Sequence, residues 1–370
     1  MRSALIVFVA VLTVLAAFTP AVAAGGHAAN VAQEEPTCEF PFEGEDATGE
    51  QVTIEEEPDS VVALQPSDAQ ILFEIGAEEK VDGMPVNEYT AYLEADEELD
   101  ISDDMGSPVA EEVIDRDPDV VLAASHLAND DVVDQLRDAG LTVYVFPIEE
   151  SLDDVAENVR TTGELVGECE GAAESVEWMD ERLEIIEEAT ADEEHPLAYY
   201  AMIGSFTAGD DTFQHELMTT AGVENLGAEV GIEGWQEISE EDIIEEDPEW
   251  IIYEDSAEEP PVSESVMGTT AYQNEQFVEV DAQQFNQPGP LVVLAIEEIV
   301  QEIHPDAYAE AEAELEAGSD DADDDASDDD AADDADTDDE AADDDTIPGF
   351  GVPAAVAALL ALLAGLTHRR

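Results

Sequence analysis

Apolar residues in the first half of the chain alternate between short continuous runs and helix-like spacing. The run at 60–64 predicts a buried strand, and the spacing that follows Pro66 predicts a helix ending at Gly76. The same alternation continues with a strand at 120–124, an amphipathic helix at 129–140 and a strand at 141–147. Strands that alternate with helices of this length are typical of βαβ units. Residues 58–150 are therefore predicted to form an α/β lobe with a mainly parallel sheet.

The pattern resumes after Pro196 and contains a repeat. Residues 109–125 and 238–254 both read as a short helix, an Asp-Pro turn and a buried strand, about 130 positions apart. A strand at 197–203 and a helix at 211–222 precede the second copy. A strand at 277–281, a loop and a helix ending near Pro305 follow it. We therefore predict a second lobe, similar to the first, over residues 195–305.

One long helix is predicted between the two lobes. Residues 151–190 keep helical spacing without a proline, and a continuous helix of this length would span about 55 Å. Gly163, Gly167 and Gly171 are the positions at which it would bend or break. The fold class is therefore α/β, with two Rossmann-like lobes joined by one long rigid helix. Residues 25–57 form an acidic N-terminal arm.

Apolar segments lie at both ends of the chain. Residues 1–24 combine Arg2, a short apolar core and small residues, as in a secretory signal peptide; the alternative is an uncleaved anchor. Residues 347–370 hold about twenty uncharged, mostly apolar positions before two arginines, which predicts a membrane anchor whose end faces the cytoplasm. The body is then expected on the outer face of the membrane. Residues 306–346 are expected to be a disordered acidic spacer, with calcium buffering as a weaker alternative.

The charge balance indicates a high salt concentration around the protein and disfavours one class of partner. The chain has 98 acidic and 8 basic residues, a net charge of −90. The stretch 320–345 holds 17 of the acids, so 81 (98 − 17) lie elsewhere and the folded body is itself polyanionic. Molar salt, with a Debye length of about 3 Å, would screen this repulsion. A high-salt proteome is the favoured origin, against one acidic protein in an ordinary cell. Nucleic-acid binding is disfavoured because there is no basic patch.

Few residues offer reactive chemistry. Neither a nucleotide-binding glycine loop nor a zinc spacing nor a G-x-S-x-G elbow occurs, and no nucleophile–base pair stands out, so we do not expect an enzyme. His126 follows a predicted strand, where open α/β sheets bind ligands. A metal site with His215 is conceivable, but solvated or packed histidines are favoured. Cys38 and Cys169 form a disulfide in an extracellular protein unless the fold separates them.

Aromatic and amide residues gather at predicted strand ends and loops. They are Gln65, Asn87, Tyr89, Phe206, Trp235, Phe285, Asn286 and Gln287. For Phe206 and Phe285 the alternative is a place in the core. Aromatic rims on two facing lobes suit a large, partly planar ligand held between them.

Several segments, in this order, resemble the solute-binding proteins of ABC importers for vitamin B12, iron–siderophores and haem, the group with a single rigid helix between its lobes. The segments are VVALQPSDAQILFEIGA, SPVAEEVIDRDPDVVLAASH, LTVYVFPIEESLDDVAENVRTTGELVG, FTAGDDTFQHELMTTAGVENLG, GWQEISEEDIIEEDPEWIIY and FNQPGPLVVLAIEEIVQEIHP. The resemblance covers about residues 58–305. It implies an extracellular receptor that delivers its ligand to an ABC permease and ATPase. A second resemblance, of Pro348-Gly349-Phe350 and the following apolar helix, is to the sorting signal of haloarchaeal surface proteins, where a lipid sometimes replaces the segment.

The family resemblance assigns roles to particular residues. In such proteins a glutamate on each lobe docks onto permease arginines, and the repeat places these at Glu111 and Glu241; the alternative is simple stabilisation of helix N-termini. Cobalamin-binding members surround the corrin with aromatic side chains, which match Tyr89, Trp235 and the 285–287 segment. Met105 stands where such a member has a tryptophan.

The small number of basic side chains narrows the choice of ligand. Between residues 25 and 319 the basic residues are Lys80, Arg116, Arg137, Arg160 and Arg182. Anionic siderophores usually meet arginines or lysines in this family, so a corrinoid such as cobalamin is favoured. An iron–siderophore or haem receptor of the same fold is the alternative, and a structural or adhesive surface protein is the alternative from another class.

Overall fold

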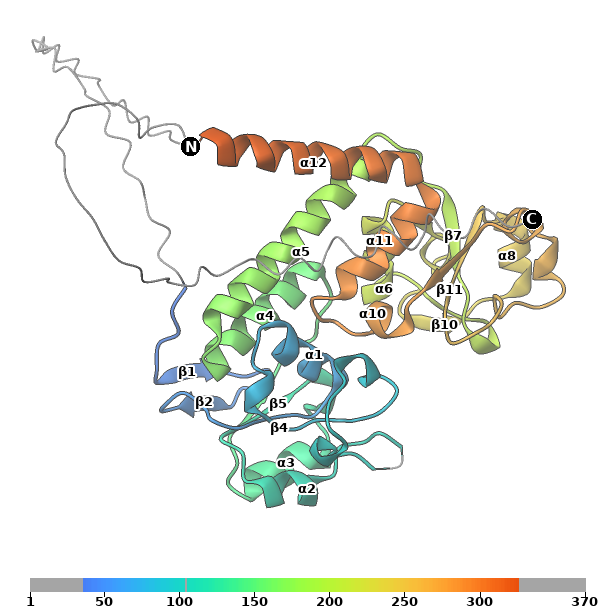
Figure 1. Cartoon of the computed structure of the whole chain (residues 1–370). Helices are drawn as coiled ribbons and strands as arrows, with labels where there is room; N and C mark the ends of the chain where they lie inside the picture. The colour runs from blue at the N-terminus through green and yellow to red at the C-terminus, as the bar shows by residue number, and fades with distance from the viewer. Residues whose placement is uncertain (1–35, 104, 326–370) are drawn as a thin grey trace, which may run out of the picture. The chain divides into compact units, whose positions relative to one another are not determined.

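Two four-stranded parallel sheets form the centres of two lobes in the computed structural model, which describes residues 36–103 and 105–325 (Figure 1). The N-terminal sheet has the order β4-β3-β5-β6 and the C-terminal sheet the order β12-β11-β7-β9. All neighbouring strands within both sheets are parallel. The strands are β3 (Val61–Ala63), β4 (Val81–Gly83), β5 (Val120–Ala123), β6 (Val143–Val145), β7 (Leu197–Tyr200), β9 (Glu224–Asn225), β11 (Trp250–Glu254) and β12 (Phe277–Val280). The predicted fold class is confirmed.

Helices pack on these sheets, most of them where the apolar spacing predicted. They are α1 (Pro66–Glu74), α2 (Ala110–Arg116), α3 (Asp131–Asp138), α6 (Phe213–Thr220), α7 (Leu226–Glu229), α8 (Glu240–Glu246), α9 (Thr270–Gln273), α10 (Ala282–Asn286) and α11 (Val292–Ile303). Three of the short helices, α7, α9 and α10, were not predicted; α10 lies in the segment expected to be a loop. Single 3₁₀ turns occupy Glu78–Lys80, Ala91–Leu93, Glu97–Leu99, Ser125–Leu127, Ile203–Ser205 and Val266–Gly268. An antiparallel hairpin pairs β1 (Phe42–Glu45) with β2 (Gln51–Ile54), and a second antiparallel pair joins β8 (Phe206–Ala208) and β10 (Trp235–Glu237), which are separated in the chain by α6, β9 and α7.

The repeated segment has the same geometry in both lobes. Helices α2 and α8 each end at an aspartate with left-handed backbone, Asp117 at φ 52° and Asp247 at φ 49°. The N–H of each aspartate donates to the carbonyl of an isoleucine in the preceding helix, which closes the helix before the proline. Each turn then leads directly into the buried strand, β5 or β11. The prediction of two similar units is therefore confirmed.

The predicted forty-residue helix is divided into α4 (Leu152–Val166) and α5 (Cys169–Thr190). Gly167 adopts φ +85° and caps α4, and the two helices pack side by side. A Cβ at Gly163 would lie 2.5 Å from Cβ of Ala172, so glycine permits this close approach. Helix α5 contacts both lobes, through α1 and α11. At 22 residues it is about 33 Å long, shorter than the expected connection.

The folded part extends beyond Pro305, where the acidic spacer was expected to begin. Helix α12 spans Pro305–Asp325, and Tyr308 and Ala311 are buried against the core. The Tyr308 hydroxyl donates to Glu297 over 2.9 Å, and Arg182 holds the same carboxylate at 2.7 and 2.8 Å. These contacts keep the first turns of the predicted spacer on the protein, so residues 306–317 belong to the fold.

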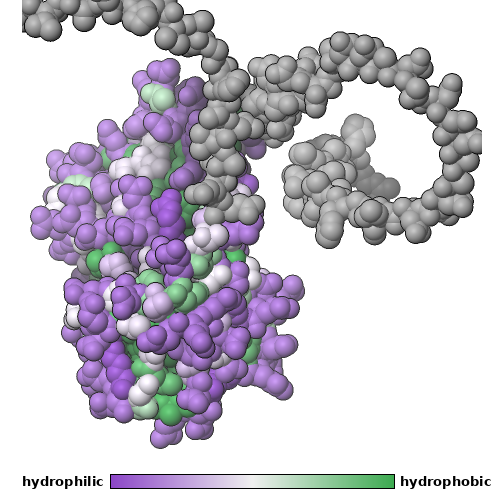
Figure 2. Space-filling model, turned by 90° about the vertical axis from the view of Figure 1, so that its left-hand side faces the viewer, coloured by the Kyte–Doolittle hydropathy of each residue, from purple (hydrophilic) through white to green (hydrophobic). Residues whose placement is uncertain are grey.

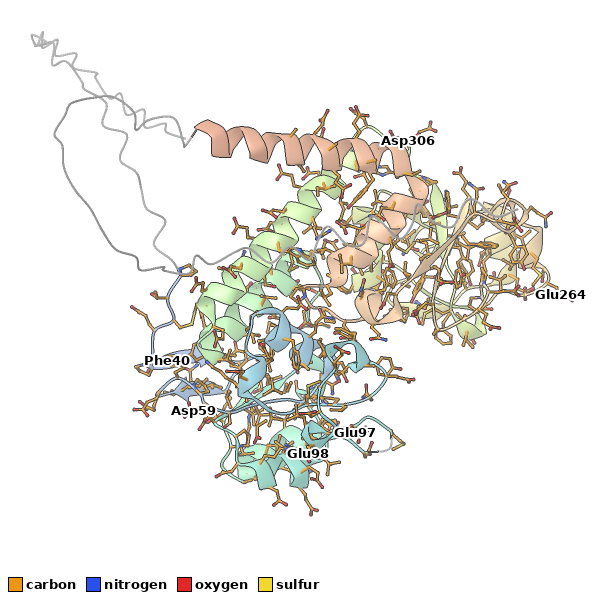
Figure 3. The ribbon with its side chains drawn as sticks, in the orientation of Figure 1. Phe40, Asp59, Glu97, Glu98, Glu264 and Asp306 are labelled. Atoms are coloured by element: carbon orange, nitrogen blue, oxygen red, sulfur yellow. A yellow bond between two sulfur atoms is a disulfide. The ribbon has the colours of Figure 1, made fainter. Side chains whose placement is uncertain are left out.

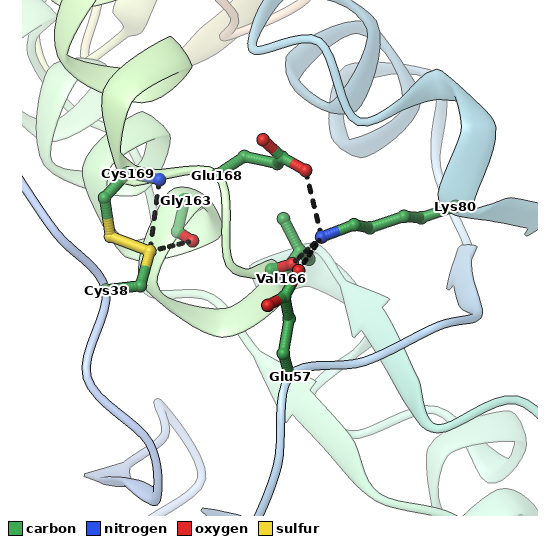
Figure 4. The surroundings of a disulfide bond; sticks show 7 residues. All are labelled: Cys38, Glu57, Lys80, Gly163, Val166, Glu168 and Cys169. Atoms are coloured by element: carbon green, nitrogen blue, oxygen red, sulfur yellow. Dashed lines mark hydrogen bonds and ion pairs between the residues drawn. A yellow bond between two sulfur atoms is a disulfide. The ribbon is translucent and has the colours of Figure 1, made fainter.

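Figure 4 shows two of the attachments of the N-terminal arm. Cys38 and Cys169 form the disulfide that the sequence left open. Nearby, the Lys80 ammonium lies 2.9 Å from both Glu57 and Glu168 and 2.6 Å from the Val166 carbonyl. The arm is thereby held against α5 and the end of α4.

The surface is dominated by acidic side chains. Figure 2 shows a mostly hydrophilic face with scattered apolar patches, and in Figure 3 the side chains of Glu264 and Asp306 lie at the outside. Over 36–103 and 105–325, no helix is long and apolar enough to cross a membrane. The expected signal peptide and C-terminal anchor lie outside these residues.

Candidate functional site

Two adjoining cavities lie between the lobes, and we call them together the interlobe cleft. The inner cavity, about 290 Å³, is lined by Gln65, Pro66, Ser67, Tyr89, Ala124, Ser125, His126, Glu149, Ala282, Asn286, Gln287 and Pro288. The outer cavity, about 640 Å³, is lined by Glu88, Tyr89, Met202, Trp235, Glu254, Asp255, Ser256, Ala282, Gln283 and Asn286. Tyr89, Ala282 and Asn286 line both. Many of these residues follow the carboxyl ends of β3, β5, β11 and β12, where open α/β sheets bind ligands.

A network of buried amides joins the lobes beneath the cleft. Gln70 of α1 donates to the Tyr92 hydroxyl over 2.7 Å and accepts from the Leu291 N–H over 3.1 Å. Gln287 accepts from the Tyr92 hydroxyl at 3.2 Å and donates to the Tyr89 carbonyl at 2.8 Å. The backbone of Tyr89, which lines both cavities, is thus held by the opposite lobe. This connection and α5 together join the two lobes.

Aromatic side chains form part of both walls. Trp235 projects from β10 with 43% of its surface exposed, and its ring meets Tyr200 edge to face with centroids 6.1 Å apart. Tyr200 in turn packs on Phe285 at 5.2 Å. Phe285 is completely buried, so its predicted contact with the ligand is wrong and it supports the wall from behind. Tyr89, half exposed, faces the cleft from the N-terminal lobe.

A carboxylate stands at the end of β11, in the middle of the C-terminal wall. Glu254 accepts a hydrogen bond of 2.5 Å from the Tyr200 hydroxyl and one of 2.9 Å from the Asn286 amide. Burial, the negative charge of Glu254 and their hydrogen bond raise the pKa of Tyr200 far above its usual value. The hydroxyl therefore stays a donor at any physiological pH. Asn286 and Tyr200 together orient one carboxylate oxygen of Glu254.

The N-terminal wall contains groups whose charged forms are disfavoured by burial. Burial, with the nearby charge of Glu149, raises the pKa of Asp68 to about 8. Asp68 lies behind the cavity lining, and its Oδ2 has no hydrogen-bond partner among the described residues. Burial also raises the pKa of Glu149, which accepts from Asn158 at 2.6 Å. Burial lowers the pKa of His126, which leaves a neutral imidazole in the inner cavity at neutral pH.

The structure brings together six of the ten predicted ligand residues at the cleft: Gln65, Tyr89, His126, Trp235, Asn286 and Gln287. The other four are outside its lining. Asn87 accepts from the Tyr89 N–H at 2.9 Å and so positions Tyr89. Met105 is 86% exposed, Phe206 is partly exposed on β8, and Phe285 is buried. His215 lies near Asp210 and Asn225 and lines neither cavity. Across the described residues, no group of three or more potential metal ligands is found.

Sequence reasoning missed the acidic lining of the cleft. Glu149, Glu254 and Asp255 follow strand ends, which was the available signal. In a chain with 98 acids, a carboxylate at a strand end does not stand out, because nearly every loop carries one.

Four of the five basic residues in the described ranges are used inside the fold, away from the cleft. Lys80 holds the arm, Arg116 donates to backbone carbonyls including that of Glu98, Arg137 pairs with Asp46, and Arg182 pairs with Glu297. The fifth, Arg160, is exposed on α4. None of the five lines either cavity. An anionic ligand would therefore meet carboxylates and amides, without a compensating cation.

The two predicted docking glutamates occupy the same position in the repeat. Glu111 and Glu241 are each the second residue of their helix, α2 or α8, and both are exposed. The neighbouring Glu240 accepts from the Ser265 hydroxyl. Glu241 is thus the glutamate at this end of α8 that remains available to a partner.

Several known proteins are similar to this chain in sequence or in fold. The sequence model of a family described as "Periplasmic binding protein" matches residues 61–283. The chain is 38% identical over 352 residues to the cobalamin-binding protein of Halobacterium salinarum, covering 92% of this chain and 91% of that protein. It is 22% identical to the vitamin B12-binding protein of Salmonella choleraesuis, covering 65% and 88%. The solved structure of the molybdate periplasmic binding protein MolA of Haemophilus influenzae aligns with a TM-score of 0.62 at 17% identity, covering 73% and 93%.

Proposed function

Because this chain belongs to the periplasmic binding protein family, we propose that it binds a corrinoid, cobalamin foremost, in the interlobe cleft and delivers it to an ABC permease. It is a solute-binding protein and not an enzyme, and this membership leaves the structural or adhesive alternative without support. The similarity to a cobalamin-binding protein over nearly the whole chain supports the choice of ligand class.

The residues that line the cleft are the main observation in favour of a corrinoid ligand. Its two adjoining cavities, of about 290 and 640 Å³, are lined by Tyr89 from one lobe and by Trp235 from the other. Cobalamin has a flat ring for these aromatic groups and amide side chains that can hydrogen-bond to Asn286 and Gln287. The absence of basic side chains from the lining disfavours anionic siderophores.

To deliver the ligand, the receptor would dock onto the permease through the N-terminal ends of α2 and α8. Glu111 and Glu241 lie at equivalent, exposed positions on the two lobes, so they can meet two equivalent arginine sites on a dimeric permease. In a protein covered with carboxylates, this symmetric placement is what distinguishes them.

The receptor works outside the cytoplasm, and residues 347–370 hold it at the outer face of the membrane. Their apolar length and their resemblance to a haloarchaeal sorting signal support this attachment. The acid-rich surface supports a working environment of molar salt. Cells that carry a chain without 347–370 should release the receptor into the medium, which fractionation and immunoblotting would detect.

Titration of the full chain with cobalamin in molar potassium chloride tests the function. We expect a dissociation constant below about 10 µM and a loss of at least tenfold in Trp235→Ala. Ile244→Ala, which removes an exposed apolar side chain of the same lobe away from the cleft, is the matched control. Absence of binding below about 10 µM would refute the corrinoid assignment.

Haem is the second candidate because of His126. A neutral imidazole in the inner cavity is suited to bind iron along the axis of a porphyrin. Titration with ferric haem, followed by its absorption spectrum, separates the two ligands. If haem is the ligand, it binds more tightly than cobalamin, and His126→Ala changes the spectrum of the complex.

A further inference from the structure

Glu254 presents a preorganised acceptor to the cleft. It ends β11, the second strand of the C-terminal sheet, and lines the outer cavity together with Trp235 and Asn286. The Tyr200 hydroxyl and the Asn286 amide donate to its Oε1, while Oε2 is only 3.5 Å from Ser256 Oγ, at the limit of a hydrogen bond. One oxygen is thus fully engaged in the wall, and the other is available to a donor on a ligand.

The remaining charges around the outer cavity have the same sign. Glu88 from the N-terminal lobe and Asp255 from the C-terminal lobe also line it, and Glu149 lines the adjoining inner cavity. As shown above, the five basic residues of the described ranges lie elsewhere. A bound molecule is therefore surrounded by aromatic groups, amides and carboxylates from both lobes.

Molar salt limits what these carboxylates can do at a distance. With a Debye length of about 3 Å at 1 M, the field of the exposed acids is screened before it reaches an approaching ligand. Partly buried groups in direct contact are screened much less. Discrimination by charge then depends on the groups that touch the ligand, and Glu254, half-buried and held by two donors, is the best placed of them.

Resting on the proposed function, we propose that Glu254 and its neighbouring carboxylates make the cleft selective for fully amidated corrinoids over corrinoids with side-chain carboxylates. An amide N–H of the ligand donates to Glu254 Oε2, whereas a ligand carboxylate at that place sets two negative charges and two acceptors against each other. The positive metal centre of a corrinoid is tolerated by the same lining.

The test compares ligands that share one macrocycle. Cobalamin, cobinamide and cobalamin carboxylates made by hydrolysis of the side-chain amides are titrated against the full chain in molar potassium chloride. We expect the polycarboxylate to bind at least 100-fold more weakly than cobalamin. In Glu254→Gln, the new amide keeps an oxygen for Tyr200 and offers an N–H to a ligand carboxylate, so the ratio of dissociation constants should fall at least tenfold.

Two further variants keep the result interpretable. Asp255→Asn, at an exposed lining position, should also narrow the ratio if Glu254→Gln proves unstable. Glu245→Gln makes the same charge change on α8 of the same lobe, outside the cleft, and should leave the ratio unchanged.

Each outcome decides the inference. Equal binding of cobalamin and its carboxylates overturns the selectivity but leaves the proposed function intact. Discrimination that persists in both cleft variants overturns the assignment to Glu254 and Asp255. If no corrinoid binds, the proposed function itself fails and the inference with it.

Discussion

The disulfide between Cys38 and Cys169 is predicted to be a large single contribution to the stability of the N-terminal lobe. It closes a loop with a sequence separation of 131, which contains the arm from Cys38 onward, the whole N-terminal sheet and α4. The perturbation is its removal in the double variant Cys38→Ser/Cys169→Ser. Because both cysteines are replaced, neither is left as a free thiol.

The magnitude follows from the length of the loop. The chain-entropy relation, with 131 residues, gives about 5 kcal/mol at 25 °C. Compactness of the unfolded chain reduces this value, so we expect the free energy of unfolding to fall by about 3–5 kcal/mol. This is a large part of the 5–15 kcal/mol that is typical of whole domains.

Urea unfolding in molar potassium chloride, followed by far-ultraviolet circular dichroism, measures the loss. The three tryptophans, Trp178, Trp235 and Trp250, lie in α5 and the C-terminal lobe, outside the loop. Their fluorescence therefore serves as a second probe, and a separation of the two transitions would show that the lobes unfold independently. Reducing agent added to the unaltered chain should reproduce the double variant. A loss below about 1 kcal/mol would refute the reasoning from loop entropy.

Three other perturbations test separate parts of the structure. Lys80→Met removes two ion pairs and a hydrogen bond to a backbone carbonyl from a largely buried ammonium, so the free energy of unfolding measured in urea should fall by about 1–3 kcal/mol. The control Arg160→Met, on the exposed face of α4, should change this free energy little. Burial raises the pKa of Asp68 from 3.8 to about 8, so between these pH values the folded chain keeps a proton that the unfolded chain releases. The free energy of unfolding should therefore fall as the pH rises from about 4 to about 8, by up to about 1.4 kcal/mol per pH unit. The variant Asp68→Asn should flatten this slope. Equal slopes in urea titrations of both proteins would contradict the assignment. Glu111→Arg with Glu241→Arg should abolish corrinoid uptake by cells without changing the dissociation constant of the purified receptor, and Glu112→Arg with Glu245→Arg is the matched control.

Much of the architecture could be read from local patterns. The buried runs, the helix spacing and the Asp-Pro turns each depend on interactions within a few residues, so they predicted six of the eight strands of the two main sheets, the longer helices and the repeat; the short strands β4 and β9 were missed. The same repeat singled out Glu111 and Glu241. Strand ends predicted His126 at the cleft, because parallel strands open their carboxyl ends to one edge of a sheet.

Contacts between distant segments were beyond such patterns. Whether Trp235 or Phe285 faces the ligand depends on which ring lies beneath the other, and Tyr200 places Phe285 behind the wall. The start of α12 was read as part of a spacer because its composition is acidic. The bond from Tyr308 to Glu297, itself neutralised by Arg182, holds it on the core.

By itself, the sequence determined the α/β fold class, the two lobes, the polyanionic surface and the family, because periodicity, charge and motif order are properties of the chain. Only the tertiary structure decided that α4 and α5 are separate helices packed through Gly163, that Cys38 meets Cys169, and that Glu254 faces the cleft. The reason is physical: pairing and burial depend on which surfaces meet, and the packing of whole elements sets those meetings.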